Sequence, residues 1–206
     1  MKLYHITTGP LKVNSYFIVN EKTNLAILID GGENYKTIKK VEKDYNFKIT
    51  ALLLTHAHFD HAGNAKNFQE DGVKIYISKI DAPKLLNEDN LSSDFGRKFN
   101  YCTADYLVSD GEELKINDIN IKAILTPGHT DGSMTFLIDD MLFTGDTLFA
   151  QSIGRTDFKT GSHSQIIQSI NKLFNLPGDY NVYPGHEEFT TLDYERKHNP
   201  FVDFHK

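Results

Sequence analysis

The sequence predicts an α/β fold built as a four-layer sandwich, in which two β-rich halves are each covered by helices. Two observations predict it. Short apolar or β-prone runs alternate along the chain with segments of helical periodicity. Four of these runs end alike, in a turn that holds a histidine or an aspartate; of an internal duplication, the sequence alone shows only these similar endings. With 206 residues, 39% of them hydrophobic, we expect one compact domain spanning 1–206.

Three segments illustrate the alternation of strands and helices. Residues 14–19 and 25–29 are β-prone, and the second ends at the turn residues 30–32, so we expect these two to form a hairpin. Residues 162–176 carry apolar side chains at helical spacing, from Ile166 to Phe174. Ser162 and Gln165 have the spacing of a capping box, and the Pro-Gly pair at 177–178 stops the helix. The apolar stripe of this helix predicts core packing.

One loop holds three histidines and an aspartate within six residues. It is Thr55-His56-Ala57-His58-Phe59-Asp60-His61, and it follows the apolar run 51–54. Imidazole and carboxylate ligands suit zinc, iron or manganese, and this spacing lets one loop offer ligands to two ions. A disordered His-rich tract is the alternative, but such a tract would not lie between a strand-like run and the small-residue turn 62–64. The loop therefore predicts a metal site.

Three further strand-like runs lead to residues of the same kind. Residues 121–125 precede His129, residues 141–144 precede Asp146, and residues 181–183 precede His186. Ligands at the C-terminal ends of adjacent strands converge on one rim, where a rigid sheet holds them while leaving them open to substrate. We therefore expect all these side chains to share one site.

These motifs, in this order, resemble the metallo-β-lactamase superfamily and, within it, the short glyoxalase II-like (hydroxyacylglutathione hydrolase-like) group. The resemblance is nearly full length. It covers His-x-His-x-Asp-His at 56–61, Pro-Gly-His-Thr at 127–130, Gly-Asp-Thr-Leu-Phe at 145–149, the segments 152–157 and 184–186, and Asn-Pro-Phe at 199–201. It implies an αββα four-layer sandwich of the metallo-β-lactamase type, with a dinuclear site along one edge.

The resemblance also implies seven metal ligands. One ion would be held by His56, His58 and His129, the other by Asp60, His61 and His186, and Asp146 would bridge them. We expect two divalent metal ions, zinc first, with iron or manganese as alternatives. The ions would lower the pKa of a shared water, and the resulting metal-bound hydroxide would attack a carbonyl carbon. Asp60 is also expected to be catalytic, by orienting the proton of that hydroxide.

The implied function is a metal-dependent hydrolase that cleaves a thioester, with hydroxyacylglutathione (S-lactoylglutathione) as the expected substrate. A thiolate leaves without a strong protein acid because its pKa is moderate. Full-length glyoxalase II enzymes continue beyond the Asn-Pro-Phe motif into a helical domain that contacts glutathione, so recognition of glutathione itself is left open. The alternatives are a mononuclear iron persulfide dioxygenase of the same fold, a hydrolase of another ester, lactone or thioester, and a non-enzymatic binding module.

Composition limits which kinds of partner and which cellular location we expect. The formal net charge is -6, and the lysines are scattered among acids, so we expect a small-molecule thioester and no nucleic-acid partner. No apolar run is long enough to span a membrane, and the first residues lack the hydrophobic region of a signal peptide. We therefore expect a soluble cytoplasmic protein. The single cysteine, Cys102, excludes an internal disulfide and is interpreted as a buried or bystander thiol.

Several prominent residues receive other interpretations. Arg155 and Asp157 are expected to form a loop-fixing ion pair or to support the metal ligands, and substrate contact is the alternative. Asp30 is interpreted as a turn or supporting acid that could act on a metal-ligating histidine. Glu187 and Asp131 depart from the glycine and proline common in the resembling family, and both could reshape the rim of the pocket. Four histidines are expected to lie outside the metal site: His5, His163, His198 and His205.

Overall fold

The computed structural model describes residues 1–202, and His205 lies outside this range. The first of two sheets has the spatial order β1 (Lys2–Thr8), β2 (Val13–Asn20), β3 (Leu25–Ile29), β4 (Lys48–Leu53), β5 (Lys74–Ser78) and β6 (Tyr106–Val108). Strands β3 to β6 run parallel, whereas β1, β2 and β3 pair antiparallel. The predicted hairpin is confirmed, because β2 pairs with β3 and Tyr16 lies opposite Ile29.

The second sheet is formed by the following part of the chain. Its order is β14 (Thr190–Thr191), β13 (Asn181–Pro184), β10 (Met141–Gly145), β9 (Met134–Ile138), β8 (Ile119–Leu125) and β7 (Glu113–Ile116). Strands β10 and β13 are parallel, and β9 runs antiparallel to both β8 and β10. The C-terminal ends of β8, β10 and β13 therefore lie at one edge. A small ribbon, β11 (Leu148–Phe149) and β12 (Ser152–Ile153), follows β10.

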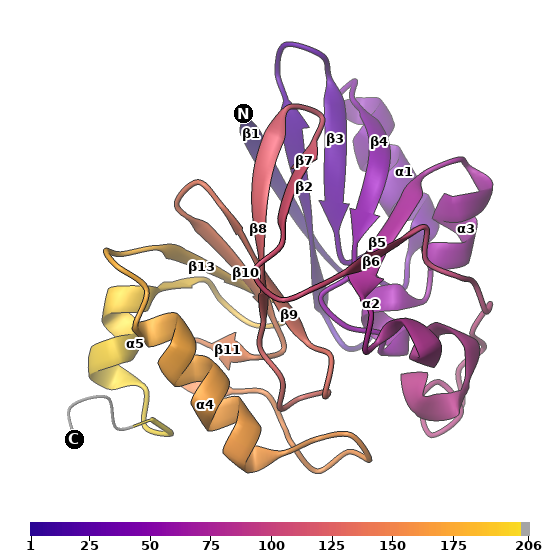
Figure 1. The fold of residues 1–206 in the computed structure, drawn as a ribbon. Coiled ribbons are helices and arrows are strands. Elements are labelled where there is room, and N and C mark those ends of the chain that lie inside the picture. Colours follow the sequence, from indigo (N-terminus) through magenta and orange to yellow (C-terminus); the bar gives the residue numbers. More distant parts are fainter. Residues whose placement is uncertain (203–206) are drawn as a thin grey trace.

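Helices cover the outer face of each sheet. The helices of the described chain are α1 (Tyr35–Asp44), α2 (Phe59–Ala62), α3 (Ala65–Glu70), the 3-10 helices η1 (Ala82–Leu86) and η2 (Glu88–Asn90), α4 (His163–Phe174) and α5 (Leu192–His198). Figure 1 shows α1 and α3 beside the first sheet, and α4 and α5 beside the second. The predicted helix is confirmed as α4. The Ser162 hydroxyl accepts the Gln165 backbone N–H at 3.4 Å, as expected of an N-cap.

The core has three parts, which correspond to the gaps between four layers. Alternate residues of β2 face opposite ways: Phe17 packs under the helices of the first sheet, whereas Tyr16 packs between the two sheets. On the second sheet, Leu142 packs with Ile170 of α4. Each fully buried side chain of this size contributes about 1.5–3 kcal/mol through removal of apolar surface from water. The predicted α/β four-layer sandwich is confirmed.

Cys102 lies in the core beneath the first sheet, 4% exposed. Burial raises the pKa of its thiol to about 11, which keeps it protonated and unreactive near neutral pH. This agrees with its interpretation as a buried thiol. Within residues 1–202, no helix is long and apolar enough to cross a bilayer. One domain over 1–206, cytoplasmic location and the absence of a nucleic-acid partner stay predictions.

Candidate metal centre

Seven side chains from four strand ends converge at one edge of the sandwich. His56, His58, Asp60 and His61 follow β4, His129 follows β8, Asp146 follows β10 and His186 follows β13. We call them the seven-residue cluster. They form three overlapping groups, and within each group the ligand atoms lie within 4.8 Å of one another. The structure thus brings together every residue that the sequence predicts for the metal site.

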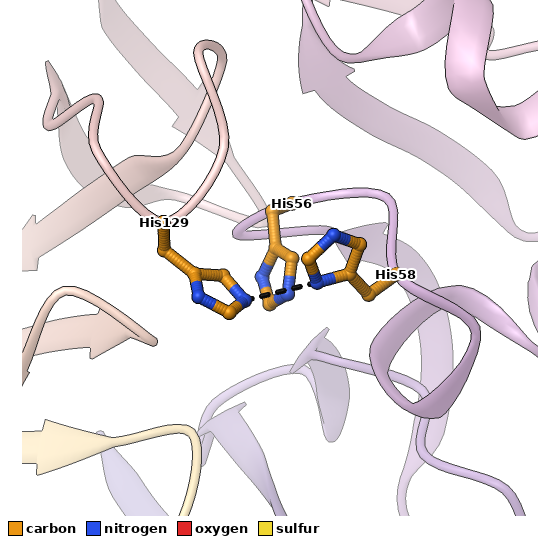
Figure 2. Close-up of side chains that lie close together, drawn as sticks. All are labelled: His56, His58 and His129. Carbon is orange, nitrogen blue, oxygen red and sulfur yellow. Dashed lines mark hydrogen bonds between the residues drawn. The ribbon is translucent and has the colours of Figure 1, made fainter. Parts of the chain in front are cut away.

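The first group consists of His56, His58 and His129, whose rings converge on one point from three directions (Figure 2). His58 Nδ1 lies 2.9 Å from His129 Nε2. The His56 ring centre lies 4.6 Å from that of His58 and 4.8 Å from that of His129. Burial holds the pKa of His56 and of His58 well below the ordinary value for histidine. These imidazoles are therefore neutral and have lone pairs for a cation.

The second group consists of Asp60, His61 and His186. His186 Nε2 lies 3.3 Å from Asp60 Oδ2 and 3.3 Å from His61 Nε2. Burial by itself would raise the pKa of Asp60, but the neighbouring His61 and His186 outweigh it and leave this pKa below its ordinary value. Asp60 is therefore an ionised carboxylate at neutral pH.

Asp146 lies between the two groups. Its Oδ1 is 3.3 Å from His61 Nε2, and its Oδ2 is 3.4 Å from His129 Nε2. The turn beside Asp146 needs a glycine at position 185 for the carboxylate to lie here, since a Cβ on Gly185 would lie 2.3 Å from Asp146 Oδ1. The position suits a carboxylate that bridges two ions.

Two buried polar atoms in the cluster have no hydrogen-bond partner: His56 Nε2 and Asp146 Oδ1. Leaving a buried polar group unpaired costs about 1–3 kcal/mol. A cation would satisfy both atoms, and a set of imidazoles and carboxylates is the donor set that zinc, iron and manganese accept. The residues present therefore fit divalent ions.

The outward ring nitrogens of three histidines are held by oxygen atoms. His129 Nδ1 donates to the Arg155 carbonyl at 2.9 Å, and His186 Nδ1 donates to the Leu11 carbonyl at 2.9 Å. His61 Nδ1 lies 2.8 Å from Asp30 Oδ2. In each ring this leaves Nε2 toward the cluster, which is how partners outside a metal site orient its histidines.

Asp30 thus holds His61, a histidine of the cluster. This agrees with the expectation that it could be a supporting acid for a metal-ligating histidine. It is 1% exposed, and its carboxylate also accepts the backbone N–H and the hydroxyl of Thr55, at 2.9 and 2.8 Å. Its φ of 56° also marks it as a turn residue. Asp30 therefore ties the loop that carries the cluster to the end of β3.

We expect Asp30→Asn to weaken zinc binding about 10- to 100-fold, because the amide holds His61 less firmly and removes a charge that favours the bound cation. Calorimetric titration of zinc into the metal-free variant measures this. The matched control is Asp118→Asn, since Asp118 also has a positive φ, of 60°, but lies in an exposed turn. Equal zinc affinity of Asp30→Asn and the wild type would rule out this role.

A pocket of about 360 Å³ opens beside the cluster. Its walls are largely apolar: Leu11, Phe59, Leu91, Phe95, Phe149, Ile153 and Phe158. The Phe158 ring centre is 5.4 Å from that of His58, so Phe158 covers the first group. The Arg155 guanidinium stacks on Phe158 at 4.2 Å and donates to both carboxylate oxygens of Asp157, at 2.7 and 2.6 Å. The expected loop ion pair is confirmed.

A buried charged network behind the cluster was not predicted. Asp81, 0% exposed, accepts the Ala57 backbone N–H at 2.9 Å, the Thr130 hydroxyl at 3.0 Å and the ammonium of Lys84. Lys84 also pairs with Asp131, the residue that stands where the family often has a proline. The network joins the loop after β4 to the turn after β8. Single charged residues at helical turns carry no sequence signal of burial.

A second unpredicted residue, Asn14, holds the turn that carries His186. Its side-chain amide donates to the Pro184 carbonyl at 3.1 Å and to the Glu187 carbonyl at 3.0 Å. Glu187 has a φ of 63°, a left-handed conformation that glycine adopts more readily, which explains why a glycine is common there. Glu187 also lines the pocket.

The histidines expected outside the metal site within the described chain do lie outside it. His5 Nε2 lies 3.0 Å from Asn14 Oδ1, and His198 Nδ1 donates to the Tyr194 carbonyl at 2.9 Å. His163 is exposed at the start of α4. None of the three belongs to a group with the geometry of a metal site within residues 1–202.

A four-layer αββα sandwich with a buried histidine and carboxylate cluster at its edge defines a class of metal-dependent hydrolases. The chain belongs to the metallo-β-lactamase superfamily, whose family description matches residues 8–186. It is 35% identical to hydroxyacylglutathione hydrolase GloC of Haemophilus influenzae, over 98% of this chain and 99% of that protein.

Two solved structures are similar. The chain superposes on the BLEG-1 B3 metallo-beta-lactamase with a TM-score of 0.92 and 33% identity, covering 100% of both chains. It superposes on TTHA1623, solved in a di-iron-bound form, with a TM-score of 0.86 and 28% identity, covering 96% of this chain and 99% of that one. These similarities support a metal-dependent site.

Proposed function

We propose that this protein is a thioester hydrolase that uses two divalent metal ions, zinc first. The observation that carries the proposal is the seven-residue cluster, complete and open to a pocket. In the proposed arrangement, His56, His58 and His129 would hold one ion, Asp60, His61 and His186 would hold the other, and Asp146 would contribute to both.

The bound ions would supply an activated water and polarise the substrate carbonyl. The chain's own residues do the rest. Asp60 lines the pocket, and its carboxylate orients a proton of the attacking water. Phe149 and Phe158 exclude bulk water from the reacting carbonyl. The departing thiolate needs no strong acid from the protein, because its pKa is moderate.

Hydroxyacylglutathione is the proposed substrate. It is supported by the full-length similarity to the Haemophilus influenzae protein that bears this name. Zinc is proposed because neutral imidazole and carboxylate suit it, and iron is the first alternative, because a 28% identical structure holds a di-iron centre.

The test is hydrolysis of S-lactoylglutathione by protein reloaded with zinc, manganese or iron, compared with metal-free protein. We expect metal-dependent loss of the thioester, and little cleavage of a chromogenic cephalosporin measured in parallel. Cephalosporin cleavage without thioester cleavage would replace this proposal with the activity in the name of the BLEG-1 relative. Failure to cleave the thioester with any of the three metals would refute hydroxyacylglutathione as substrate.

An iron persulfide dioxygenase of the same fold is the alternative reaction. Oxygen uptake with glutathione persulfide separates it from hydrolysis, because hydrolysis consumes no oxygen. The three buried or half-buried ligands of the second group favour hydrolysis, since a mononuclear centre would leave Asp60, His61 and His186 without a cation. Iron-dependent oxygen uptake with one ion per chain would favour the dioxygenase.

A further inference from the structure

A second hollow, of about 300 Å³, shares Phe59 as a lining residue with the pocket at the metal centre. Phe59 lines both hollows, so they are neighbours. The second is polar: its walls include the carboxylate of Glu33, the side chains of Asn64, Asn67 and Asn100, and the cations of Arg97 and Lys98. We call it the Glu33–Arg97 pocket.

One loop forms walls of both hollows. Leu91 and Phe95 line the metal pocket, whereas Arg97 and Lys98 line the Glu33–Arg97 pocket. The Phe95 ring centre lies 5.2 Å from that of Phe59. The lining therefore changes from apolar beside the metal centre to charged beyond Phe59. A substrate whose carbonyl lies at the metal centre and whose other end is charged would find matching surroundings in the two hollows that share Phe59.

The charged groups of the Glu33–Arg97 pocket are incompletely paired. The Glu33 side chain is 15% exposed, and its Oε2 is a buried atom without a hydrogen-bond partner. Its Oε1 lies 3.7 Å from Arg97 Nε, too far for a hydrogen bond. Within residues 1–202, Lys98 forms no ion pair or hydrogen bond. The pocket thus offers two cations and the exposed part of the Glu33 side chain to a ligand, while Glu33 Oε2 is buried behind it.

Resting on the proposed function, we propose that the Glu33–Arg97 pocket binds the thiol part of the thioester. The ligand class is a peptide thiol that carries one ammonium and two carboxylates, as glutathione does. Glu33 would accept the ammonium, and Arg97 and Lys98 would bind the carboxylates. The side chains of Asn67 and Asn100 offer both donors and acceptors to peptide groups, whereas the Asn64 side-chain NH2 already donates to the Gly31 and Gly32 carbonyls, at 3.1 and 2.9 Å. In the metal pocket, by contrast, the Arg155 guanidinium is already paired with Asp157.

Calorimetric titration of S-methylglutathione, a thioether that cannot be hydrolysed, into the zinc-loaded protein tests this binding directly. We expect the wild type to bind S-methylglutathione, and we expect the affinity of Arg97→Gln to be lower by about tenfold or more. Lys40→Gln is the control, since it removes the same charge from an exposed position on α1. The proposal fails if the wild type does not bind, or if Arg97→Gln binds as the wild type does.

A second variant tests which part of the ligand Glu33 contacts. Glu33→Gln should weaken binding of S-methylglutathione but leave unchanged the binding of its N-acetyl derivative, which has no ammonium. Equal effects on both ligands would show that Glu33 does not contact the ammonium, and would overturn this assignment.

Kinetics distinguish this inference from the proposed function. Arg97→Gln should raise KM for S-lactoylglutathione about tenfold, with little change in kcat, and should leave kcat/KM for the neutral thioester S-acetyl-N-acetylcysteamine unchanged. Binding of S-methylglutathione through Arg97 without hydrolysis of any thioester would refute the hydrolase and keep the pocket. Hydrolysis of both thioesters with no effect of Arg97→Gln would keep the hydrolase and refute the pocket.

Discussion

We expect His58→Ala to lower the proposed hydrolysis of S-lactoylglutathione by about a thousandfold, equivalent to about 4 kcal/mol of activation free energy. His58 is 4% exposed, and its Nδ1 lies 2.9 Å from His129 Nε2, so both nitrogens face one cation position. Removing one of three residues that would hold this ion would weaken its binding, and the substrate carbonyl would lose the polarisation that the ion would supply. Steady-state kinetics in excess zinc, together with the zinc content of the isolated variant, measure the two effects.

His163→Ala is the matched control, because His163 is exposed at the start of α4 and lies outside the cluster. We expect wild-type zinc content and turnover from it. Full activity of His58→Ala at unchanged zinc content would remove His58 from the ligand set and contradict the assignment of the first ion.

We expect Asp81→Ala to destabilise the metal-free protein by about 3 kcal/mol, because it breaks a buried ion pair and leaves the buried Lys84 ammonium with only the half-exposed Asp131 as a partner. Asp81 accepts the Ala57 backbone N–H at 2.9 Å, the Thr130 hydroxyl at 3.0 Å and the ammonium of Lys84, itself 4% exposed. All three donors lose this acceptor together. Urea unfolding of the metal-free protein measures the change without the added stability that bound zinc gives.

Asp131→Ala provides the comparison for Asp81→Ala. Asp131 pairs with the same ammonium, but its side chain is 48% exposed, so we expect its loss to cost about 1 kcal/mol or less. Equal destabilisation by the two substitutions would show that the Asp81 network contributes no more than a surface ion pair.

The strand ends and their ligands could be predicted because they have a local signal. His129, Asp146 and His186 each follow a β-prone run by a few residues, and the order of these motifs resembles one family. The hairpin of β2 and β3 and the helix α4 were likewise predicted from periodicity and turn residues. Local sequence patterns were sufficient wherever a single segment determines the secondary structure or the position of a ligand.

The unpredicted features depend on contacts between distant segments. Asp81 meets Thr130, and Asn14 meets the turn at 184–187, yet neither residue has a neighbour pattern that predicts its burial. The Glu33–Arg97 pocket likewise combines the segment after β3 with the loop that follows η2. Such residues come together only when the strands pair and the two sheets pack. Composition and periodicity therefore do not predict these contacts.

Zinc titration of the metal-free protein, followed by isothermal calorimetry and by elemental analysis of the dialysed product, tests the dinuclear centre most directly. We expect two zinc ions per chain in the wild type and one in His186→Ala, whose remaining ligands still include the complete first group. A wild-type protein that binds one ion or none, with His186→Ala unchanged from it, would contradict a dinuclear site built on the seven-residue cluster.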